Sequence, residues 1–221
     1  MKIIIDFDGP IVDVSPRYYF IYRALTEKYG ATHTLSKDEY WSLKRKRTPI
    51  PEILKLSGLP ASAHLTYINE RLSIIENKEF LAYDRLYPFV PGVIKELSVF
   101  SEIYIVTLRN RRENLSWQLS ELDIGHLFPN VYSLDNNDGT WEVKKRLVLD
   151  AQIMENGEKT YFVGDTEADV LAANDLNAIS VAVESGIRNR EMLEALNPDF
   201  IIPDISTIGK LIRDNNDTKS A

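Results

Sequence analysis

Residues 2–13, Lys2-Ile3-Ile4-Ile5-Asp6-Phe7-Asp8-Gly9-Pro10-Ile11-Val12-Asp13, begin with a short apolar run that ends in two carboxylates. A continuous β-branched run, as opposed to an alternating one, is typical of a strand that is buried on both faces. Five later segments have the same character: Ile103–Thr107, Val131–Ser133, Thr160–Asp165, Ile179–Val183 and Phe200–Ile202. The sequence therefore predicts six strands of one buried sheet.

Helical patterns lie between these strands in the second part of the chain. They cover Gly92–Phe100, Arg112–Leu122, Val143–Met154 and Ala168–Leu176. Strands that alternate with helices from about residue 90 to 212 indicate crossover connections between parallel strands. We therefore expect an α/β fold with a doubly wound parallel sheet.

A long stretch after the first strand interrupts this alternation. Ser15 to Tyr87 contains no convincing strand and four helical segments: Arg17–Tyr29, Lys37–Arg45, Pro51–Leu56 and Ala63–Asn77. We predict a core domain of residues 1–14 and 88–213, an inserted α-helical cap domain of residues 15–87, and a flexible tail of residues 214–221.

Composition narrows the class of protein. The chain has 221 residues, of which 44% are hydrophobic and 27% charged, as in soluble globular proteins. Its net charge of -7 argues against nucleic acid or an anionic membrane as the main partner. The chain contains no cysteine, which excludes disulfides and thiol nucleophiles. No apolar run suits a signal peptide or a membrane span, so we expect a cytoplasmic location. We expect the protein to be a monomer or a homodimer.

Polar residues stand where the predicted strands end. Asp6 and Asp8 follow the first strand, Thr107 ends the second, and Asp165 ends the fourth, with Asp169 one helical turn further on. Ligands of open parallel sheets bind beyond the carboxyl ends of the strands. We therefore expect the fold to gather these five residues at one edge of the sheet.

This set of residues suits Mg²⁺-assisted phosphoryl transfer. Mg²⁺ prefers oxygen ligands such as the carboxylates of Asp6 and Asp165. A carboxylate can also attack phosphorus, and a second one two residues later, Asp8, can move the proton. A hydroxyl and a lysine would stabilise the transferred oxygens. An aspartate after a strand is more often a turn former, so the prediction depends on the combination.

The same segments resemble the motifs of the haloacid dehalogenase superfamily of phosphohydrolases. The first motif is matched by Ile5–Asp13, the second by Ile105–Leu108, and the fourth by Val163–Val170. The insertion that follows the first motif is similar to the helical cap of the phosphoglycolate phosphatase and β-phosphoglucomutase branch. The resemblance covers nearly the whole chain and implies a Mg²⁺-dependent phosphatase that hydrolyses a small phosphorylated metabolite.

The resemblance also implies a role for each residue. Asp6 would be the nucleophile and a metal ligand, and Asp8 the general acid/base that also offers its backbone carbonyl to the metal. Thr107 would bind the phosphoryl group, Asp165 would be a metal ligand, and Asp169 a ligand or a supporting partner. The two adjoining loops add three candidate substrate contacts: Gly9, Leu108 and Arg109.

The chain departs from the family pattern at two places. Pro10 stands where the family usually has threonine, and it removes a hydroxyl and a backbone N–H from the loop. The third motif is a lysine, for which Lys144 and Lys145 are candidates. We prefer Lys144, since Leu147 and Val148 then follow at the i+3 and i+4 positions of a buried helix face.

The densest basic stretch lies in the predicted insertion, at Lys44–Pro51. In capped relatives this loop lies over the active site, so Arg45, Lys46 or Arg47 is expected to bind a second anionic group of the substrate. The alternative is a solvated run of charges.

Two other functions fit the same residues. A phosphomutase would use the same site and return the phosphoryl group to its substrate. A non-catalytic protein that binds a phosphorylated metabolite would retain the fold without turnover, and Pro10 and the irregular lysine motif favour that alternative.

Overall fold

The computed structural model describes residues 1–154 and 158–217. Six parallel strands form one sheet in the order β5-β4-β1-β6-β7-β8. Their bounds are β1 (Lys2–Ile5), β4 (Glu102–Val106), β5 (Val131–Tyr132), β6 (Thr160–Gly164), β7 (Ile179–Val183) and β8 (Phe200–Ile202). Each strand overlaps one of the six predicted segments, and the doubly wound α/β fold is confirmed.

The strand β1 lies in the middle of this sheet. Ile3 pairs with Ile103 of β4 on one side and with Tyr161 of β6 on the other. The isoleucines of β1 are completely buried because both of its faces are covered. The loops that follow β4, β1 and β6 therefore lie next to one another at the carboxyl edge of the sheet.

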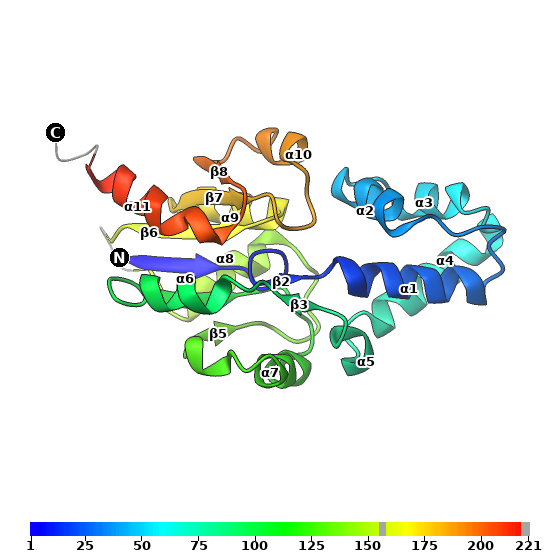
Figure 1. Cartoon of the computed structure of the whole chain (residues 1–221), viewed down its shortest axis with the longest axis horizontal. Coiled ribbons are helices and arrows are strands. Elements are labelled where there is room, and N and C mark those ends of the chain that lie inside the picture. The colour runs from blue at the N-terminus through cyan, green and yellow to red at the C-terminus, as the bar shows by residue number, and fades with distance from the viewer. Residues whose placement is uncertain (155–157, 218–221) are drawn as a thin grey trace.

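Helices cover both faces of the sheet (Figure 1). The helices α6 (Val90–Leu97), α7 (Arg112–Glu121) and α11 (Ile208–Asp217) pack in one core with Ile3 and Ile5. The helices α8 (Trp141–Asp150) and α9 (Glu167–Asp175) pack in a second core with Ile4. The shorter α10 (Arg190–Glu194) lies beside β8, and the 3-10 helices are η1 (Gly125–Leu127) and η2 (Ile205–Thr207). Successive β1 side chains thus enter opposite apolar layers, as a pleated strand requires.

A bundle of helices lies beyond the carboxyl ends of the strands, at the right of Figure 1. Its members are α1 (Ser15–Lys28), α2 (Lys37–Arg45), α3 (Ile50–Leu56), α4 (Ala61–Ile74) and α5 (Lys78–Leu81). Apolar residues such as Ile21, Leu54 and Tyr67 give it a core of its own. Where the chain enters and leaves this bundle, β2 (Val12–Asp13) and β3 (Arg85–Leu86) form an antiparallel pair.

The structure differs from the sequence prediction at several elements. The strand pair β2–β3 and the helices α5, α10 and α11 were not predicted. The expected tail is wrong for residues 214–217, which continue α11. This helix is anchored by buried Ile208 and Ile212, and Asn215 donates a hydrogen bond to the Tyr161 hydroxyl at 3.1 Å. Residues 218–221 of the expected tail lie outside the described residues. Within residues 1–154 and 158–217, no helix has both the length and the apolarity needed to cross a membrane.

Candidate active site

Three of the predicted site residues directly follow adjacent strands of the sheet. Asp6 follows β1, Thr107 follows β4 and Asp165 follows β6, and all three are buried. Asp6 and Thr107 line a cavity of about 270 Å³ together with Asp8 and Leu108. Residues of α1 and α4 close the same cavity, so the site lies between the sheet edge and the helical bundle.

Carboxylates crowd together at this edge. One carboxylate oxygen from each of Asp6, Asp165 and Asp169 lies within 4.8 Å of the others. Burial raises the pKa of Asp6 to about 6, against the opposing effect of Lys144. Burial and the neighbouring carboxylates of Asp169 and Asp6 raise the pKa of Asp165 well above its ordinary value. These shifts indicate negative charge that a cation would stabilise.

Asp165 has a free coordination position. Its Oδ2 accepts a hydrogen bond from the Ile187 amide at 2.5 Å, whereas its buried Oδ1 has no hydrogen-bond partner among the described residues. An unpaired buried carboxylate oxygen is costly unless a ligand occupies the position beside it. The acidic cluster, with only oxygen donors and this free oxygen, fits Mg²⁺.

Gly9 allows the backbone to pass close to this cluster. Its φ of +95° is in the region that favours glycine, and a Cβ atom there would lie 2.4 Å from Cγ of Asp165. The carbonyl of Gly9 also accepts a hydrogen bond from the Ser185 hydroxyl at 3.0 Å. The structure thus places Gly9, a predicted substrate contact, against the carboxylate of Asp165.

The two candidate lysines lie in different environments. Lys144 is fully buried, its Nζ is 2.8 Å from Oδ2 of Asp6, and it forms a second ion pair with Asp169. Burial acts to lower the pKa of Lys144, but the carboxylates of Asp169 and Asp6 together have the larger effect and raise the pKa above its ordinary value. The side chain is therefore a cation. Lys145 is 37% exposed and pairs with Asp175 at 2.5 Å. The structure therefore brings Lys144 to the carboxylates and directs Lys145 away from them.

Asp169 already uses both of its carboxylate oxygens. Oδ1 pairs with Lys144, and Oδ2 accepts from the Thr166 amide at 3.0 Å and from the Thr166 hydroxyl at 2.7 Å. The Thr166 contacts form a capping box at the start of α9. Of the two roles predicted for Asp169, this arrangement favours the supporting one, because Asp169 holds the ammonium group of Lys144 beside Asp6.

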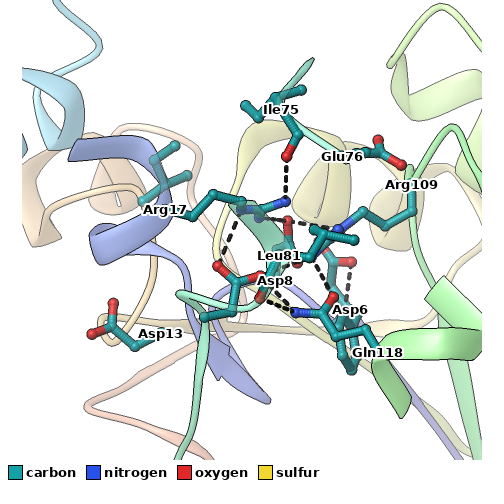
Figure 2. Close-up of polar contacts among 12 residues, drawn as sticks. Asp6, Asp8, Asp13, Arg17, Ile75, Glu76, Leu81, Arg109 and Gln118 are labelled. Carbon is teal, nitrogen blue, oxygen red and sulfur yellow. Dashed lines mark hydrogen bonds and ion pairs between the residues drawn. The ribbon is translucent and has the colours of Figure 1, made fainter. Parts of the chain in front are cut away.

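Two arginines hold the carboxylate of Asp8 (Figure 2). Arg109 Nη2 lies 2.6 Å from Oδ1, and Arg17 Nη2 lies 2.7 Å from Oδ2. Both guanidinium groups also pair with Asp84, at 3.2 and 3.1 Å. Burial alone would raise the pKa of Asp8, but Arg109 and Arg17 outweigh it and hold the pKa at about 2. Asp8 is therefore an ionised carboxylate in this arrangement.

Sequence reasoning missed Arg17 and Asp84 and assigned Arg109 to the substrate. In the structure, Arg109 is buried and directed to Asp8, Asp84 and Gln118. The charged residues of this network lie at positions 8, 17, 84 and 109, so no local pattern marks them as partners. The loop that carries Arg109 is held by Glu76, whose carboxylate accepts from the backbone amides of residues 110 and 111 at 2.9–3.0 Å.

The basic stretch of the insertion mainly contacts the core. The Arg45 guanidinium donates to the carbonyl oxygens of Glu184, at 2.6 Å, and Arg188, at 3.0 Å. Arg47 lies 3.4 Å from Glu167, and Lys46 is exposed. Thus Arg45 docks α2 onto the core, Arg47 contacts Glu167 of α9, and Lys46 faces solvent.

Pro10 fits the loop without a backbone donor. The turn is closed by hydrogen bonds from the Gly9 amide to the Val12 carbonyl, at 3.0 Å, and from the Ile11 amide to the Phe7 carbonyl, at 3.2 Å. The N–H that Pro10 lacks is therefore not needed to form this turn.

Several known proteins are similar to this chain in sequence. Residues 145–208 match a protein-family model described as HAD-hydrolase-like. A phosphoglycolate phosphatase from Synechococcus elongatus is 28% identical over 205 residues, which cover 90% of this chain and 91% of that protein. The pyrophosphatase PpaX of Oceanobacillus iheyensis is 21% identical over 96% of this chain and 97% of its own length.

Solved structures show the same fold. A haloacid dehalogenase-like hydrolase from Streptococcus pneumoniae superposes with a TM-score of 0.75 at 20% identity, over 96% of this chain and 97% of that one. The chain is thus similar, in its fold and in part of its sequence, to proteins of the haloacid dehalogenase superfamily, and these comparisons support a hydrolase. Solved structures described as a predicted phosphoglycolate phosphatase and a putative β-phosphoglucomutase also share this fold.

Proposed function

We propose that this hydrolase is a Mg²⁺-dependent phosphatase that acts on a small phosphorylated metabolite through an aspartyl-phosphate on Asp6. The observation that carries the proposal is the position of Asp6, which has a carboxylate oxygen within 4.8 Å of one from Asp165 and lies 2.8 Å from the ammonium group of Lys144. A nucleophilic carboxylate needs positive charge nearby to offset the negative charge of the reaction, and it needs access to the substrate cavity. Asp6 lines that cavity.

In the first step, a carboxylate oxygen of Asp6 attacks phosphorus while the bond from phosphorus to the leaving oxygen breaks. Lys144 offsets the negative charge, and the Thr107 hydroxyl, which lines the cavity, donates to a phosphoryl oxygen. Asp6 and Asp165 would hold Mg²⁺ together with the Asp8 carbonyl, and the ion would supply further charge neutralisation.

In the second step, water attacks the phosphorus of the aspartyl-phosphate. Asp8 accepts a proton from this water, for which the ionised form held by Arg17 and Arg109 is suited. The bond between Asp6 and phosphorus breaks, and inorganic phosphate and free Asp6 result. Arg17 and Arg109 also oppose protonation of Asp8. An alkyl leaving group needs a proton from Asp8, so Asp8 must first move away from the arginines. An aryl leaving group can leave without that proton.

The helical bundle α1 to α5 acts as a cap in this proposal. It supplies Arg17 and Arg71 to the wall of the cavity, and Arg45 fastens α2 to the core. Exclusion of water strengthens the charge interactions in the site. The relatives named for phosphoglycolate and for pyrophosphate act on small phosphorylated compounds, which supports this class of substrate. The cytoplasmic location, the monomer or homodimer, and the lack of nucleic-acid or membrane partners stay predictions.

The test is hydrolysis of p-nitrophenyl phosphate by the purified protein with Mg²⁺. We expect turnover by the wild type, no turnover by Asp6→Asn, and unchanged turnover by Asp150→Asn, which removes an exposed carboxylate from α8. Absence of turnover by the wild type across a panel of phosphate esters, or full activity of Asp6→Asn, would disprove the proposal. Phosphoryl transfer to a sugar phosphate in place of phosphate release would identify the mutase alternative.

A further inference from the structure

A second cavity of about 680 Å³ adjoins the one at Asp6. The two share Tyr18, Arg71, Leu108 and Thr166 in their walls, so they form one cleft between the helical bundle and the core. None of the residues predicted to act in catalysis lines the second cavity. Its walls instead carry four cationic side chains, which are Lys44, Arg47, Arg71 and Arg188.

Two of these four cations have a carboxylate partner and two do not. Arg188 and Arg47 both pair with Glu167, at 2.8 and 3.4 Å. Among the described residues, neither Lys44 nor Arg71 forms an ion pair with a carboxylate. Two positive charges therefore remain in the cleft without an acidic partner.

Lys44 and Arg71 come from different helices and meet over the same aromatic ring. The Nζ of Lys44, on α2, is 5.7 Å from the ring centre of Tyr18, and Cζ of Arg71, on α4, is 5.2 Å from it. Arg71 is only 8% exposed. A ring face stabilises a cation only modestly, so it does not replace a counterion.

The physical cost of this arrangement falls on Lys44. Burial and the nearby charges of Arg71 and Arg188 lower the pKa of Lys44 to about 7. Like charges in a partly desolvated cleft destabilise the folded protein unless an anion binds between them. A phosphate ester bound at Asp6 lies in the first cavity, and Arg71 lines both that cavity and the second one. The substrate is therefore the anion that we expect between these charges.

We propose that Lys44 and Arg71 bind a second anionic group of the substrate, which is therefore a phosphate ester that also carries a carboxylate or a second phosphate. This inference rests on the proposed phosphatase activity. It assigns substrate selection to two residues outside the Arg45–Arg47 segment. Arg71 connects the two parts of the cleft, and Lys44 contacts the distal group.

The test compares matched substrates that differ in the second charge. 2-Phosphoglycolate carries a carboxylate, 1,3-propanediol bisphosphate carries a second phosphate, and 2-hydroxyethyl phosphate carries neither. For Lys44→Met we expect KM to rise about tenfold for at least one of the two charged substrates, with a small change in kcat. KM for 2-hydroxyethyl phosphate should stay the same. The substrate that responds identifies the distal group as carboxylate or phosphate.

Further variants control this comparison. Lys44→Arg should restore the KM for the charged substrate, and Lys55→Met, which removes an exposed lysine of α3, should change none of the constants. Arg71→Met should act in the same direction as Lys44→Met, but Arg71 is buried and its loss can impair folding. Lys44→Met therefore decides the outcome.

Binding is measured separately from turnover. In Asp6→Asn, 2-phosphoglycolate or the bisphosphate should raise the melting temperature, and the additional Lys44→Met change should remove most of that increase. Equal KM changes for charged and uncharged substrates, or no change in Lys44→Met, would overturn the inference while leaving the phosphatase proposal intact. Failure of the wild type to hydrolyse p-nitrophenyl phosphate would instead overturn the phosphatase proposal itself.

Discussion

Arg109 holds Asp8 through two nitrogen atoms, with Nε 3.0 Å and Nη2 2.6 Å from Oδ1 of the carboxylate. Arg17 of α1 binds the other oxygen (Figure 2). Asp84 pairs with both arginines. The four residues carry two positive and two negative charges. They come from the loop after β1, the helical bundle, its connection back to the core, and the loop after β4, so this cluster joins the bundle to the catalytic edge of the sheet.

The charge balance of this cluster predicts that Asp84→Asn is strongly destabilising. The Asp84 side chain is completely buried between Arg17 and Arg109. Its neutralisation would leave two guanidinium groups with only Asp8, at a cost of about 3 kcal/mol or more. For a chain of this length we expect the melting temperature to fall by roughly 6–12 °C. Asp150→Asn, at an exposed position, is the control, and a similar melting temperature for both variants would contradict the prediction.

A matched pair of glycines tests the close approach at the acidic cluster. Gly9 and Gly30 both have positive φ angles, of +95° and +77°, but a Cβ atom clashes with Asp165 only at Gly9. Gly30→Ala should cost about 1 kcal/mol because of its backbone conformation alone. Gly9→Ala should cost more and should abolish p-nitrophenyl phosphate hydrolysis, because Asp165 must move. Equal effects of the two changes on activity would show that the approach of Gly9 to Asp165 is unimportant.

Much of this site could be predicted from the sequence because its residues follow simple rules of the fold. Asp6, Thr107 and Asp165 directly follow β-branched strands, and a parallel sheet brings such positions to one edge. Lys144 was preferred to Lys145 on helical periodicity alone, and it is the lysine that lies at Asp6. The position at the sheet edge and the choice between the two lysines needed only local patterns and one topological rule, whereas the search for a lysine came from the family resemblance.

The remaining features depend on contacts between distant parts of the chain. Arg17 lies in what the sequence presents as the start of an ordinary helix, and only the fold places it at Asp8. The high density of charge at Arg45–Arg47 was visible, but its partners, the carbonyl groups of Glu184 and Arg188, were not. Lys44 is in the same basic stretch, and only the structure shows that it has no acidic partner in the described part of the chain.

The acidic cluster predicts that Asp165→Asn affects the melting temperature in opposite directions with Mg²⁺ and without it. Addition of Mg²⁺ to the wild type, after treatment with EDTA, should raise the melting temperature by roughly 5 °C at saturating concentrations. Asp165→Asn should lose this response and the hydrolytic activity. In EDTA it should be at least as stable as the wild type, because repulsion of Asp165 by Asp169 and Asp6 is removed. A full Mg²⁺ response in this variant would exclude Asp165 as a ligand.

The unpaired charge at Lys44 predicts that its removal stabilises the protein. Its neighbours are Arg71 on α4, Arg188 after β7 and Tyr18 on α1, and no carboxylate within residues 1–154 and 158–217 pairs with Lys44. The pKa of Lys44 in the folded protein, about 7, is below its ordinary value of 10.5. Protonated Lys44 therefore lowers the stability of the fold by its full amount below about pH 7, where the side chain is protonated in both the folded and the unfolded chain. This loss of stability decreases as the pH rises toward the pKa of Lys44 in the unfolded chain.

Lys44→Met should accordingly raise the melting temperature of the ligand-free protein at about pH 6 by at least about 2 °C. The gain should shrink as the pH is raised to about 9, and Lys55→Met should stay within about 1 °C of the wild type throughout. The same Lys44→Met change is expected to raise KM for a doubly anionic substrate. A residue whose loss stabilises the fold but weakens substrate binding is held in place by function, whereas a loss of stability in Lys44→Met would indicate a structural role for this lysine.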